Sequence, residues 1–367
     1  MAGVEPHGRP YIEETGAAMV LSAVADPPVR RGSDYAQLSR RVSQAGLLQR
    51  RPGWYVARIA LTLGIFAAGW VAVFAVGDSW WQALVAVVMA VATTQVAFLG
   101  HDAGHRQMFR RRGPSEAVGL IAGNLAVGLS YGWWVDKHNR HHANPNHEDE
   151  DPDVGAGALV WTYEQALGTR GFGRWLARRQ AYLFFPMLLL EGLNLHVASI
   201  QAIVGREPDG RFRTPMRHRR VEALLLGVHT AGYLAALLLA MSPGKALLFA
   251  AVHQGLWGLY MGCAFAPNHK GMPMPTAEDE LDFLRKQVLT SRNVRGGRFV
   301  DTALGGLNYQ IEHHLFPNMP RANLRRAQPL VRAYCAEQGI PYAETGLFDS
   351  YRQALGHLHE VGRPLRS

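Results

Sequence analysis

The chain has few cysteines and no motif for binding a nucleotide. Only two of its 367 residues are cysteine, Cys263 and Cys335, so they provide no disulfide framework and favour a reducing compartment. No internal repeat and no glycine-rich phosphate loop is present. The apolar run from Ala17 to Ala25 follows Glu13 and Glu14, where an export signal would carry positive charge. These absences argue against a disulfide-rich secreted protein and against a nucleotide-binding enzyme.

The charge balance is basic, with a formal net charge of +9. Such a balance can indicate binding to nucleic acid, but no nucleic-acid-binding motif accompanies it. The arginines instead flank apolar runs, as at Arg110 to Arg112 and at Arg217, Arg219 and Arg220. Anionic lipid head groups are the nearer partner at such positions. We therefore expect membrane lipid as a partner and no nucleic acid.

Apolar residues make up 48% of the chain and are gathered in blocks. A helix needs about 20 apolar residues to cross a bilayer. Four blocks approach that length and predict two helical hairpins, with spans at Ile59 to Val76, Gln82 to Gly100, Ala223 to Met241 and Ala246 to Ala266.

Two further apolar stretches are not predicted to cross the membrane. Ala117 to Val135 is interrupted by glycines. It also lies between the histidine-containing segments at His105 and His138, which must be on the same side of the membrane to build one site. Ala181 to Ile200 contains Glu191, Asn194 and His196, which are costly at bilayer depth. We expect both stretches to be buried in a cytosolic cap or to lie in the interface.

The distribution of basic residues predicts the orientation. The loop from Gly77 to Trp81 has no Lys or Arg, and the other short loop has only Lys245. Basic residues on the cytoplasmic side are typical of membrane proteins. Both termini and all the histidine motifs are therefore expected in the cytoplasm, in an integral, multi-pass protein of the cell membrane.

Histidines form three groups with short, regular spacing. Residues three and four apart share one face of a helix, so each group converges on a point. Converging neutral imidazoles predict a metal site, and seven such ligands exceed what one tetrahedral ion uses. Two metal ions, each with an open position, would use all of them. The groups are HDAGH with His101 and His105, HNRHH with His138, His141 and His142, and QIEHH with His313 and His314.

Ligand type alone does not choose the metal, because imidazole suits iron, zinc, copper and nickel. The expected site lies at the mouth of a hydrocarbon phase and has no nucleophilic Ser or Cys motif nearby. This setting points to oxidation of an unactivated C–H bond with activated oxygen. Zinc has no redox chemistry, so iron is favoured.

The segments HDAGH, HNRHHANPNHEDEDPD and NYQIEHHLFPNMPR resemble the three histidine boxes of the membrane fatty acid desaturases. Gln310, in place of a first histidine, is similar to the front-end branch. The resemblance extends from about His101 to Arg321, with plausible coverage from Tyr35 to about Tyr351. It implies a non-haem, di-iron, O2-dependent acyl desaturase. It also implies a further ligand after the last span, and His269 stands at the matching position.

The resemblance implies an external electron source. Front-end relatives often carry a fused haem domain with an H-P-G-G motif, and this motif is absent here. We therefore expect a separate donor, a ferredoxin or a flavoprotein reductase, and a fatty acyl substrate carried on coenzyme A, carrier protein or lipid.

The predicted fold class is an all-α integral membrane protein. Four transmembrane helices in two hairpins are expected to bear a cytosolic helical cap that holds a di-metal site. Residues 1–32 are predicted to be a flexible tail, 33–351 the desaturase domain and 352–367 a C-terminal tail. Ser33 is expected to cap an amphipathic helix that runs to about Arg50.

Ligating histidines usually donate their second N–H to a carboxylate or carbonyl. Five acidic residues lie near the boxes and are candidates for this role: Asp102, Asp136, Asp151, Asp153 and Glu312. Gln310 could bind iron, act through water or only donate a hydrogen bond. His229 and His253 lie inside spans, where an interhelical hydrogen bond is the commoner explanation. His196 is expected to be a packing or surface residue.

Two other functions remain open from the sequence. A di-iron lipid hydroxylase could share the ligand set and the membrane plan, because both reactions begin with hydrogen abstraction. A metal transporter with a cytosolic histidine cluster belongs to a different class. Against it, the spans contain no row of polar residues forming a path, only Glu222, His229 and His253.

Overall fold

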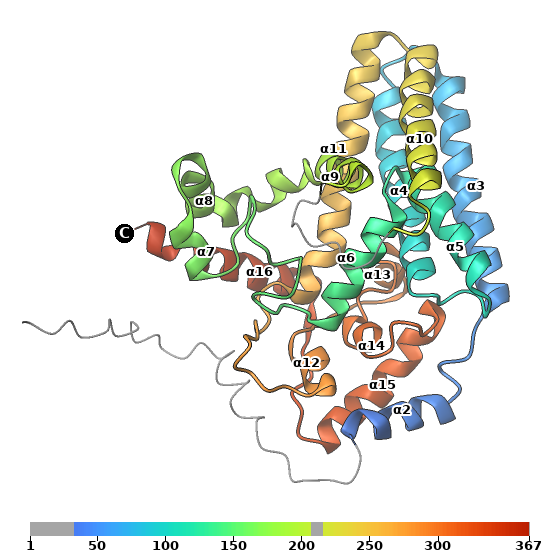
Figure 1. Ribbon diagram of the computed structural model, residues 1–367. Helices are drawn as coiled ribbons and strands as arrows, with labels where there is room; N and C mark the ends of the chain where they lie inside the picture. Colours follow the sequence, from blue (N-terminus) through green and yellow to red (C-terminus); the bar gives the residue numbers. More distant parts are fainter. Residues whose placement is uncertain (1–32, 207–215, 367) are drawn as a thin grey trace, which may run out of the picture.

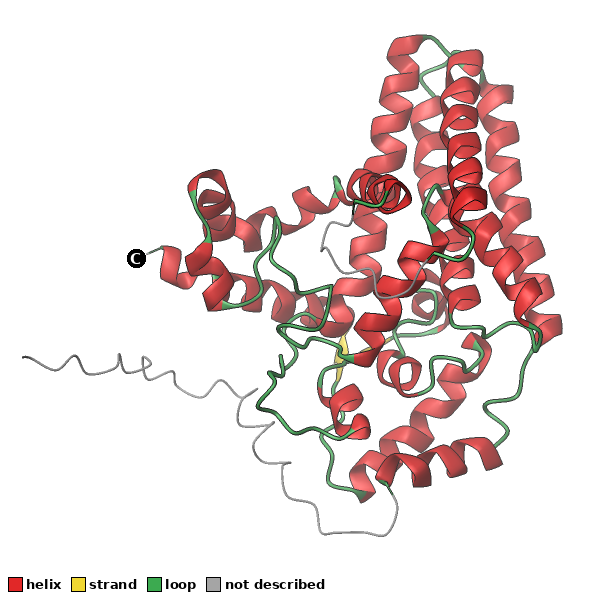
Figure 2. Cartoon of the chain, in the orientation of Figure 1, coloured by secondary structure: helices red, strands yellow, loops and turns green. Residues whose placement is uncertain are grey.

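The computed structural model describes residues 33–206 and 216–366, and its regular structure is almost entirely helical (Figure 1). The predicted tail, residues 1–32, lies outside the described residues. Within the described ranges there is one sheet, a parallel pair of three-residue strands, β1 (Asn293–Arg295) and β2 (Glu344–Gly346). Figure 2 shows how small this pair is beside the helices.

Four long apolar helices form the upper bundle in Figure 1: α3 (Pro52–Val76), α4 (Gln82–Gly104), α10 (Arg219–Ala240) and α11 (Pro243–His269). Each is long and apolar enough to cross a membrane. Large apolar side chains face outward, with Leu239 81% and Leu247 73% exposed. Such a surface suits lipid, so the structure accommodates the four predicted spans.

The helices are longer than the predicted spans. Pro52 stands in the first turn of α3, where its missing N–H costs nothing, so the helix begins seven residues before Ile59. α4 and α11 continue beyond the apolar runs to Gly104 and His269. These extensions carry histidines out of the bundle on regular helix.

Two bent segments occupy the stretches that were not predicted to cross. α5 (Arg112–Leu120) and the π-helix η1 (Ile121–Val127) meet α6 (Tyr131–Ala143) at 110°. Gly128 ends η1 with φ of 82°, a backbone conformation that glycine adopts without strain. Likewise, α8 (Gly171–Leu188) and α9 (Glu191–Val204) meet at 82°. By length and composition, each pair could also be one broken span, so their exclusion stays a prediction.

Below the bundle, short helices pack with the amphipathic N-terminal helix around a common core (Figure 1). Ser33 accepts a hydrogen bond from Ala36 N, which confirms the predicted start of α2 (Asp34–Gln44), although α2 ends before Arg50. Leu38 and Val42 of α2 are fully buried in this core. The other helices around this core are α12 (Phe283–Leu289), α14 (Gln310–Leu315) and α15 (Arg321–Glu337), while α13 (Arg298–Ala303) packs against a separate cluster through Val300.

The stretch predicted as a C-terminal tail, residues 352–367, is largely helical as far as the chain is described, to residue 366. Helix α16 (Leu347–Val361) and a 3-10 turn (Arg363–Leu365) occupy it. Leu358 is fully buried and packs in one cluster with Phe184 of α8 and Trp161, beside α7 (Tyr163–Gly168). Burial of its apolar stripe holds this amphipathic segment in place.

Candidate metal centre

The predicted histidines come from four elements and meet beneath the bundle. The end of α4 brings His101 and His105, and the end of α11 brings His269. α6 and α14 bring the remainder: His138, His141, His142, His313 and His314. All eight side chains are buried, with exposed fractions of 9% or less. The boxes expected to converge therefore do converge.

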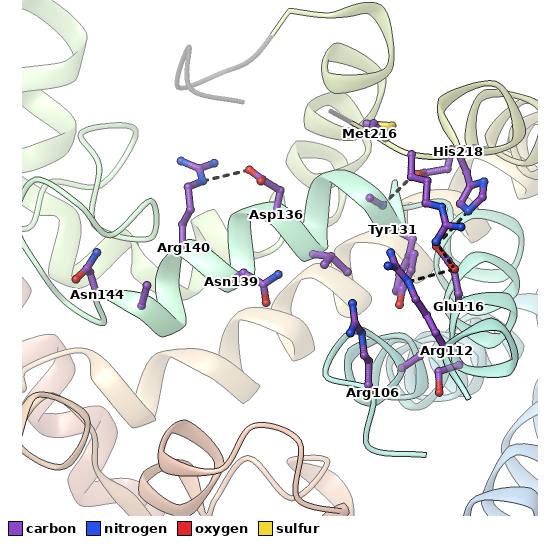
Figure 3. Close-up of a pocket in the computed structure, with 18 of the residues that line it drawn as sticks. Arg106, Arg112, Glu116, Tyr131, Asp136, Asn139, Arg140, Asn144, Met216 and His218 are labelled. Atoms are coloured by element: carbon purple, nitrogen blue, oxygen red, sulfur yellow. Dashed lines mark hydrogen bonds and ion pairs between the residues drawn. The ribbon is translucent and has the colours of Figure 1, made fainter. Parts of the chain in front are cut away.

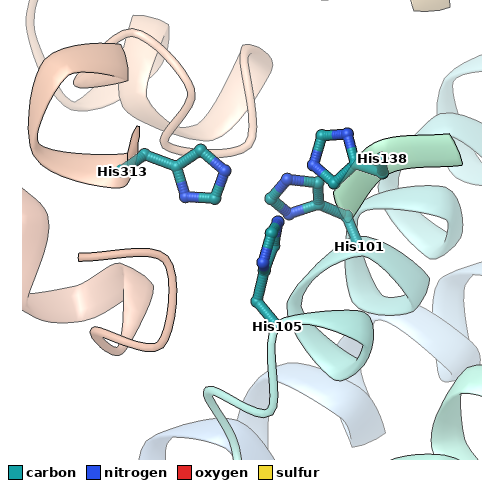
Figure 4. Close-up of side chains that lie close together, drawn as sticks. All are labelled: His101, His105, His138 and His313. Atoms are coloured by element: carbon teal, nitrogen blue, oxygen red, sulfur yellow. The ribbon is translucent and has the colours of Figure 1, made fainter. Parts of the chain in front are cut away.

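One group contains His101, His105, His138 and His313 (Figure 4). Each offers a ring nitrogen, and these four atoms lie within 4.8 Å of one another. Figure 4 shows the four rings turned toward a common point, from helices far apart in the chain. Four converging imidazoles can hold one metal ion.

A second group contains His141, His269 and His314, whose nitrogens also lie within 4.8 Å of one another. The Nε2 atoms of His269 and His314 are 3.1 Å apart. Two imidazole nitrogens that bind one ion, each at about 2 Å, are separated by about this distance.

His142 lies between the two groups. Its Nε2 is 3.1 Å from Nε2 of His138, and its ring stacks on His314 with centroids 4.1 Å apart. The structure therefore places four of the eight predicted ligands in the first group and three in the second, and His142 is next to both.

Several of these buried nitrogens have no hydrogen-bond partner within the described chain: His101 Nε2, His105 Nε2, His142 Nδ1 and both nitrogens of His313. A buried polar group without a partner costs about 1–3 kcal/mol. Burial, and then the neighbouring imidazoles, hold the pKa of His142, His313 and His314 well below the ordinary value. Neutral rings with unused lone pairs are the donors that a metal ion needs, so these residues fit two metal ions.

Two predicted carboxylates orient histidines. Asp102 Oδ1 lies 3.2 Å from Nδ1 of His101. Asp151 lies 2.9 Å from Nδ1 of His141, and it also accepts from the backbone N–H groups of Asn146 and Asp153. Burial alone would lower the pKa of His141, but the charge of Asp151 raises it overall. Such contacts leave Nε2 as the atom directed at the metal.

Two other orienting groups were not found from the sequence. Nδ1 of His269 lies 3.0 Å from the carbonyl oxygen of Thr290, and Nδ1 of His314 lies 2.9 Å from Oε1 of Gln287. A backbone carbonyl has no residue signature. The sequence pattern points to acidic residues near the boxes, whereas Gln287 is neutral and lies 27 residues from His314. Its Nε2 also donates to the carbonyl of His142.

Asp136 and Glu312, also predicted to support histidines, have other partners in the structure. Asp136 pairs with Arg140 at 3.3 Å. Glu312 accepts from Asn293 and Tyr342, and burial raises its pKa to about 7. Neighbours in a helix point to different faces, so closeness in sequence did not bring these carboxylates to the metal side.

Asp153 contacts both a lysine and a histidine of the centre. It forms an ion pair with Lys137 and lies 3.5 Å from Nδ1 of His141. Burial would raise its pKa, but Lys137 and His141 lower it overall.

Gln310 lies at the second group, with Nε2 2.9 Å from Nε2 of His269, while its Oε1 accepts from Asn268 Nδ2 at 3.4 Å.

A cavity of about 310 Å³ opens beside both groups. Its apolar wall includes Leu129, Trp134, Leu188, Met261 and Phe265, and its polar wall includes Lys137, Asp153, Lys270 and Gln310. His138, His141 and His269 also line it, and Trp134 stacks on His138 at 4.5 Å between ring centroids. An apolar chain in this cavity would contact the histidine groups directly.

The histidines of the bundle have protein partners instead. His253 Nε2 lies 3.0 Å from the Thr93 hydroxyl, and its Nδ1 lies 2.9 Å from the Tyr233 hydroxyl. These contacts join α11 to α4 and α10, so the expected interhelical hydrogen bond is confirmed for His253. His229 bonds the carbonyl of Leu125, and His196 bonds that of Gly128.

Comparison with known proteins agrees with this geometry. The family model described as fatty acid desaturase matches residues 78–346. The chain is 29% identical to the acyl-lipid (9-3)-desaturase of Physcomitrium patens, over 89% of this chain but only 62% of that protein. It is 27% identical to the Delta(6)-fatty-acid desaturase fat-3 of Caenorhabditis elegans, over 91% of this chain and 76% of the relative.

A third relative is the Delta(5) fatty acid desaturase fat-4 of Caenorhabditis elegans. It is 30% identical over 86% of this chain and 71% of its own length. The family match argues against the hypothesis that the protein is a metal transporter. With its apolar helices and histidine cluster, this multi-pass membrane protein belongs to the fatty acid desaturase family, whose members are oxidoreductases.

Proposed function

We propose that the protein is an O2-dependent, di-iron fatty acyl desaturase that introduces a double bond into an acyl chain. The main observation behind this proposal is that two buried histidine groups lie beside an apolar cavity. The names of the relatives, all fatty acyl desaturases, support the same reaction class.

The chain offers separate ligands for two iron ions. His101, His105, His138 and His313 would hold one ion, and His141, His269 and His314 the other. His142 contacts both groups, and Gln310 adjoins the second. When bound, iron would supply the activation of O2 that an unactivated C–H bond requires.

The reaction balances with an external donor. Two hydrogens leave adjacent methylene carbons, and O2 accepts four electrons in all. Two of these come from the acyl chain and two from the donor, and two further protons complete two molecules of water. We propose a separate donor, a ferredoxin or a flavoprotein reductase.

The protein's own contribution is to position the chain and its ligands. Leu129, Met261 and Phe265 would bind methylene groups and exclude water. Trp134 stacks on the ring of His138. Asp102, Asp151 and Gln287 hold Nδ1 atoms and so direct the opposite ring nitrogens. Rigid placement of this kind brings the reacting carbons to a defined distance from the metal site.

We propose that α3 with α4, and α10 with α11, form two membrane hairpins, and that the metal centre and both termini lie in the cytoplasm. Basic residues near the cytosolic ends support this orientation. Reporter fusions after Arg112, after Glu150 and at the C-terminus should report cytoplasm, and an insertion at 77–81 the opposite face. An external signal after Glu150 would mean that the bent segment before α6 crosses the membrane.

Lipid analysis tests the proposed reaction. The chain is expressed in a host that lacks the activity, and acyl products are analysed by mass spectrometry with location of double bonds. A product two hydrogens lighter supports desaturation. A product heavier by one oxygen would instead identify the enzyme as a hydroxylase. Feeding labelled acyl-coenzyme A or labelled phospholipid to isolated membranes identifies the carrier.

A further inference from the structure

A second cavity, of about 340 Å³, is shown in Figure 3. The residues of α6 that line it are on the opposite face of the helix from those that line the apolar cavity. Residues of α5, α6 and the segment at 216–222 line the second cavity. We propose that this cavity binds a phosphate group of the molecule that carries the acyl chain. The inference rests on the proposed function and adds the site that holds the carrier.

Four arginines line the cavity, Arg106, Arg112, Arg140 and Arg217, together with the carboxylates of Glu116, Asp136, Glu150 and Glu222. Most of these charges are already paired. Glu116 lies 3.6 Å from Arg112, 3.3 Å from Arg217 and 3.1 Å from His218. Asp136 pairs with Arg140.

Glu222 is also engaged. Its carboxylate is buried and accepts hydrogen bonds from Asn124, Ser130 and the backbone N–H of Gly132. This carboxylate therefore fixes the wall of the cavity and does not neutralise the arginines.

Arg106 differs from the other three arginines. Over residues 33–206 and 216–366 it forms no ion pair with a carboxylate, although its side chain lines the cavity (Figure 3). Its backbone has φ of 53°, in the left-handed region that residues other than glycine rarely adopt. Arg106 is also exposed, so its guanidinium, which has no carboxylate partner among the described residues, is accessible at the cavity.

A buried hydroxyl provides a second, independent indication. Ser115 is 1% exposed and lines the same cavity, and its Oγ has no hydrogen-bond partner among the described residues. A hydroxyl can donate to an anion, and a guanidinium forms paired hydrogen bonds with phosphate oxygens. One phosphate group would satisfy both Ser115 and Arg106.

The cavity is linked to the metal centre by shared residues. Tyr131 lines it and also lines a narrow gap of about 30 Å³, whose wall includes Gly100, His101 and Gly123. That gap in turn shares Leu129, Trp134, Met261 and Phe265 with the apolar cavity. The gap is too small for an acyl chain as it stands, so a molecule held by its phosphate at Arg106 would reach His101 only if side chains around the gap, such as Tyr131, moved apart.

Coenzyme A and phospholipid both carry such a phosphate, and binding experiments distinguish them. Titration calorimetry uses the full-length, metal-loaded protein with coenzyme A, glycerophosphocholine or inorganic phosphate as the probe. We expect one of the first two to bind more tightly than inorganic phosphate. Arg106→Gln should weaken that binding by about tenfold or more, because a charged hydrogen bond is lost.

Arg110→Gln is the matched control, since Arg110 is an exposed neighbour that does not line the cavity. It should bind like the wild type. Because Arg106 follows His105, metal content and thermal stability are measured in each variant. Arg112→Gln provides a second test away from the ligands and should also weaken binding.

The proposal is overturned if Arg106→Gln and Arg112→Gln both bind as the wild type does, or if the wild type binds neither coenzyme A nor glycerophosphocholine. The lipid products of the wild type are measured in parallel. If the double bond forms while the arginine variants bind normally, only the phosphate site is refuted. If no unsaturated product forms, the proposed reaction fails, and the binding results still decide the phosphate site.

Discussion

Buried histidines occur in two regions of this protein and have different surroundings. In the metal centre, His269 and His314 each have one nitrogen held by the protein and the other directed at a neighbouring imidazole. In the bundle, the buried His253 has protein partners at both nitrogens, the hydroxyls of Thr93 and Tyr233. Burial alone therefore does not identify a ligand; unused nitrogens that converge do.

Histidine therefore has two roles in this protein. A bundle histidine stabilises contacts between helices, so its loss should affect folding more than metal content. A histidine of the centre directs a nitrogen at the other imidazoles, so its loss should affect metal binding and catalysis. The following variants test this division.

The largest effect is expected in the centre. His138→Ala, His141→Ala and His142→Ala should each abolish desaturation and reduce bound iron, while membrane insertion is retained because the apolar spans are unchanged. Product analysis, iron content and membrane fractionation measure the three quantities. Substantial activity in any two of these variants would contradict a site shared by the boxes.

Gln310 is the next most sensitive position. Gln310→Ala should lose nearly all activity, because it removes the side chain that adjoins His269 Nε2 in a buried site. Gln310→His should keep some, since imidazole can bind metal and donate a hydrogen bond. Turnover is compared at matched iron content. Wild-type turnover by the alanine variant would make Gln310 a bystander.

Gln287 should have an intermediate effect. Gln287→Ala removes the acceptor for Nδ1 of His314, and loss of such a contact typically lowers metal affinity or activity about 10–100-fold. Gln287→Glu keeps this acceptor but loses the donor to the His142 carbonyl, so it should lose less. Iron titration of both variants measures the difference. Equal affinity in Gln287→Ala and wild type would refute the orienting role.

The smallest effect on chemistry is expected in the bundle. His253→Phe leaves the hydroxyls of Thr93 and Tyr233 without their partner, at a cost of about 1–3 kcal/mol for a buried unpaired group. Thermal unfolding should begin at a lower temperature, and iron bound per folded protein should not change. Loss of iron from this variant at a temperature where it remains folded would remove the proposed distinction.

Local patterns predicted much of the site. Spacings of three and four residues indicated which histidines share a helical face, and the structure brings all three boxes together. His269 was proposed only from a family resemblance, and the structure places it 3.1 Å from His314. Its binding to iron stays a prediction.

Other features depended on packing between distant segments. Gln287 reaches His314 because α12 lies against α14, and the residues beside His314 do not reveal this contact. Residues 352–367 are predicted as a tail, and no local pattern in them shows that α16 packs against α8. The structure of α16 comes from burial of Leu358 against Phe184 of α8.

By itself, the sequence determined the number of long apolar runs, the histidine spacings and the side chains available as ligands. These properties depend on residue type and on the regular geometry of a helix, which are local. Only the tertiary structure decided how the ligands divide between two groups, which neighbours hold each ring and where the cavities lie. Those features depend on the bends at Gly128 and after Leu188, and on the packing of helices far apart in the chain.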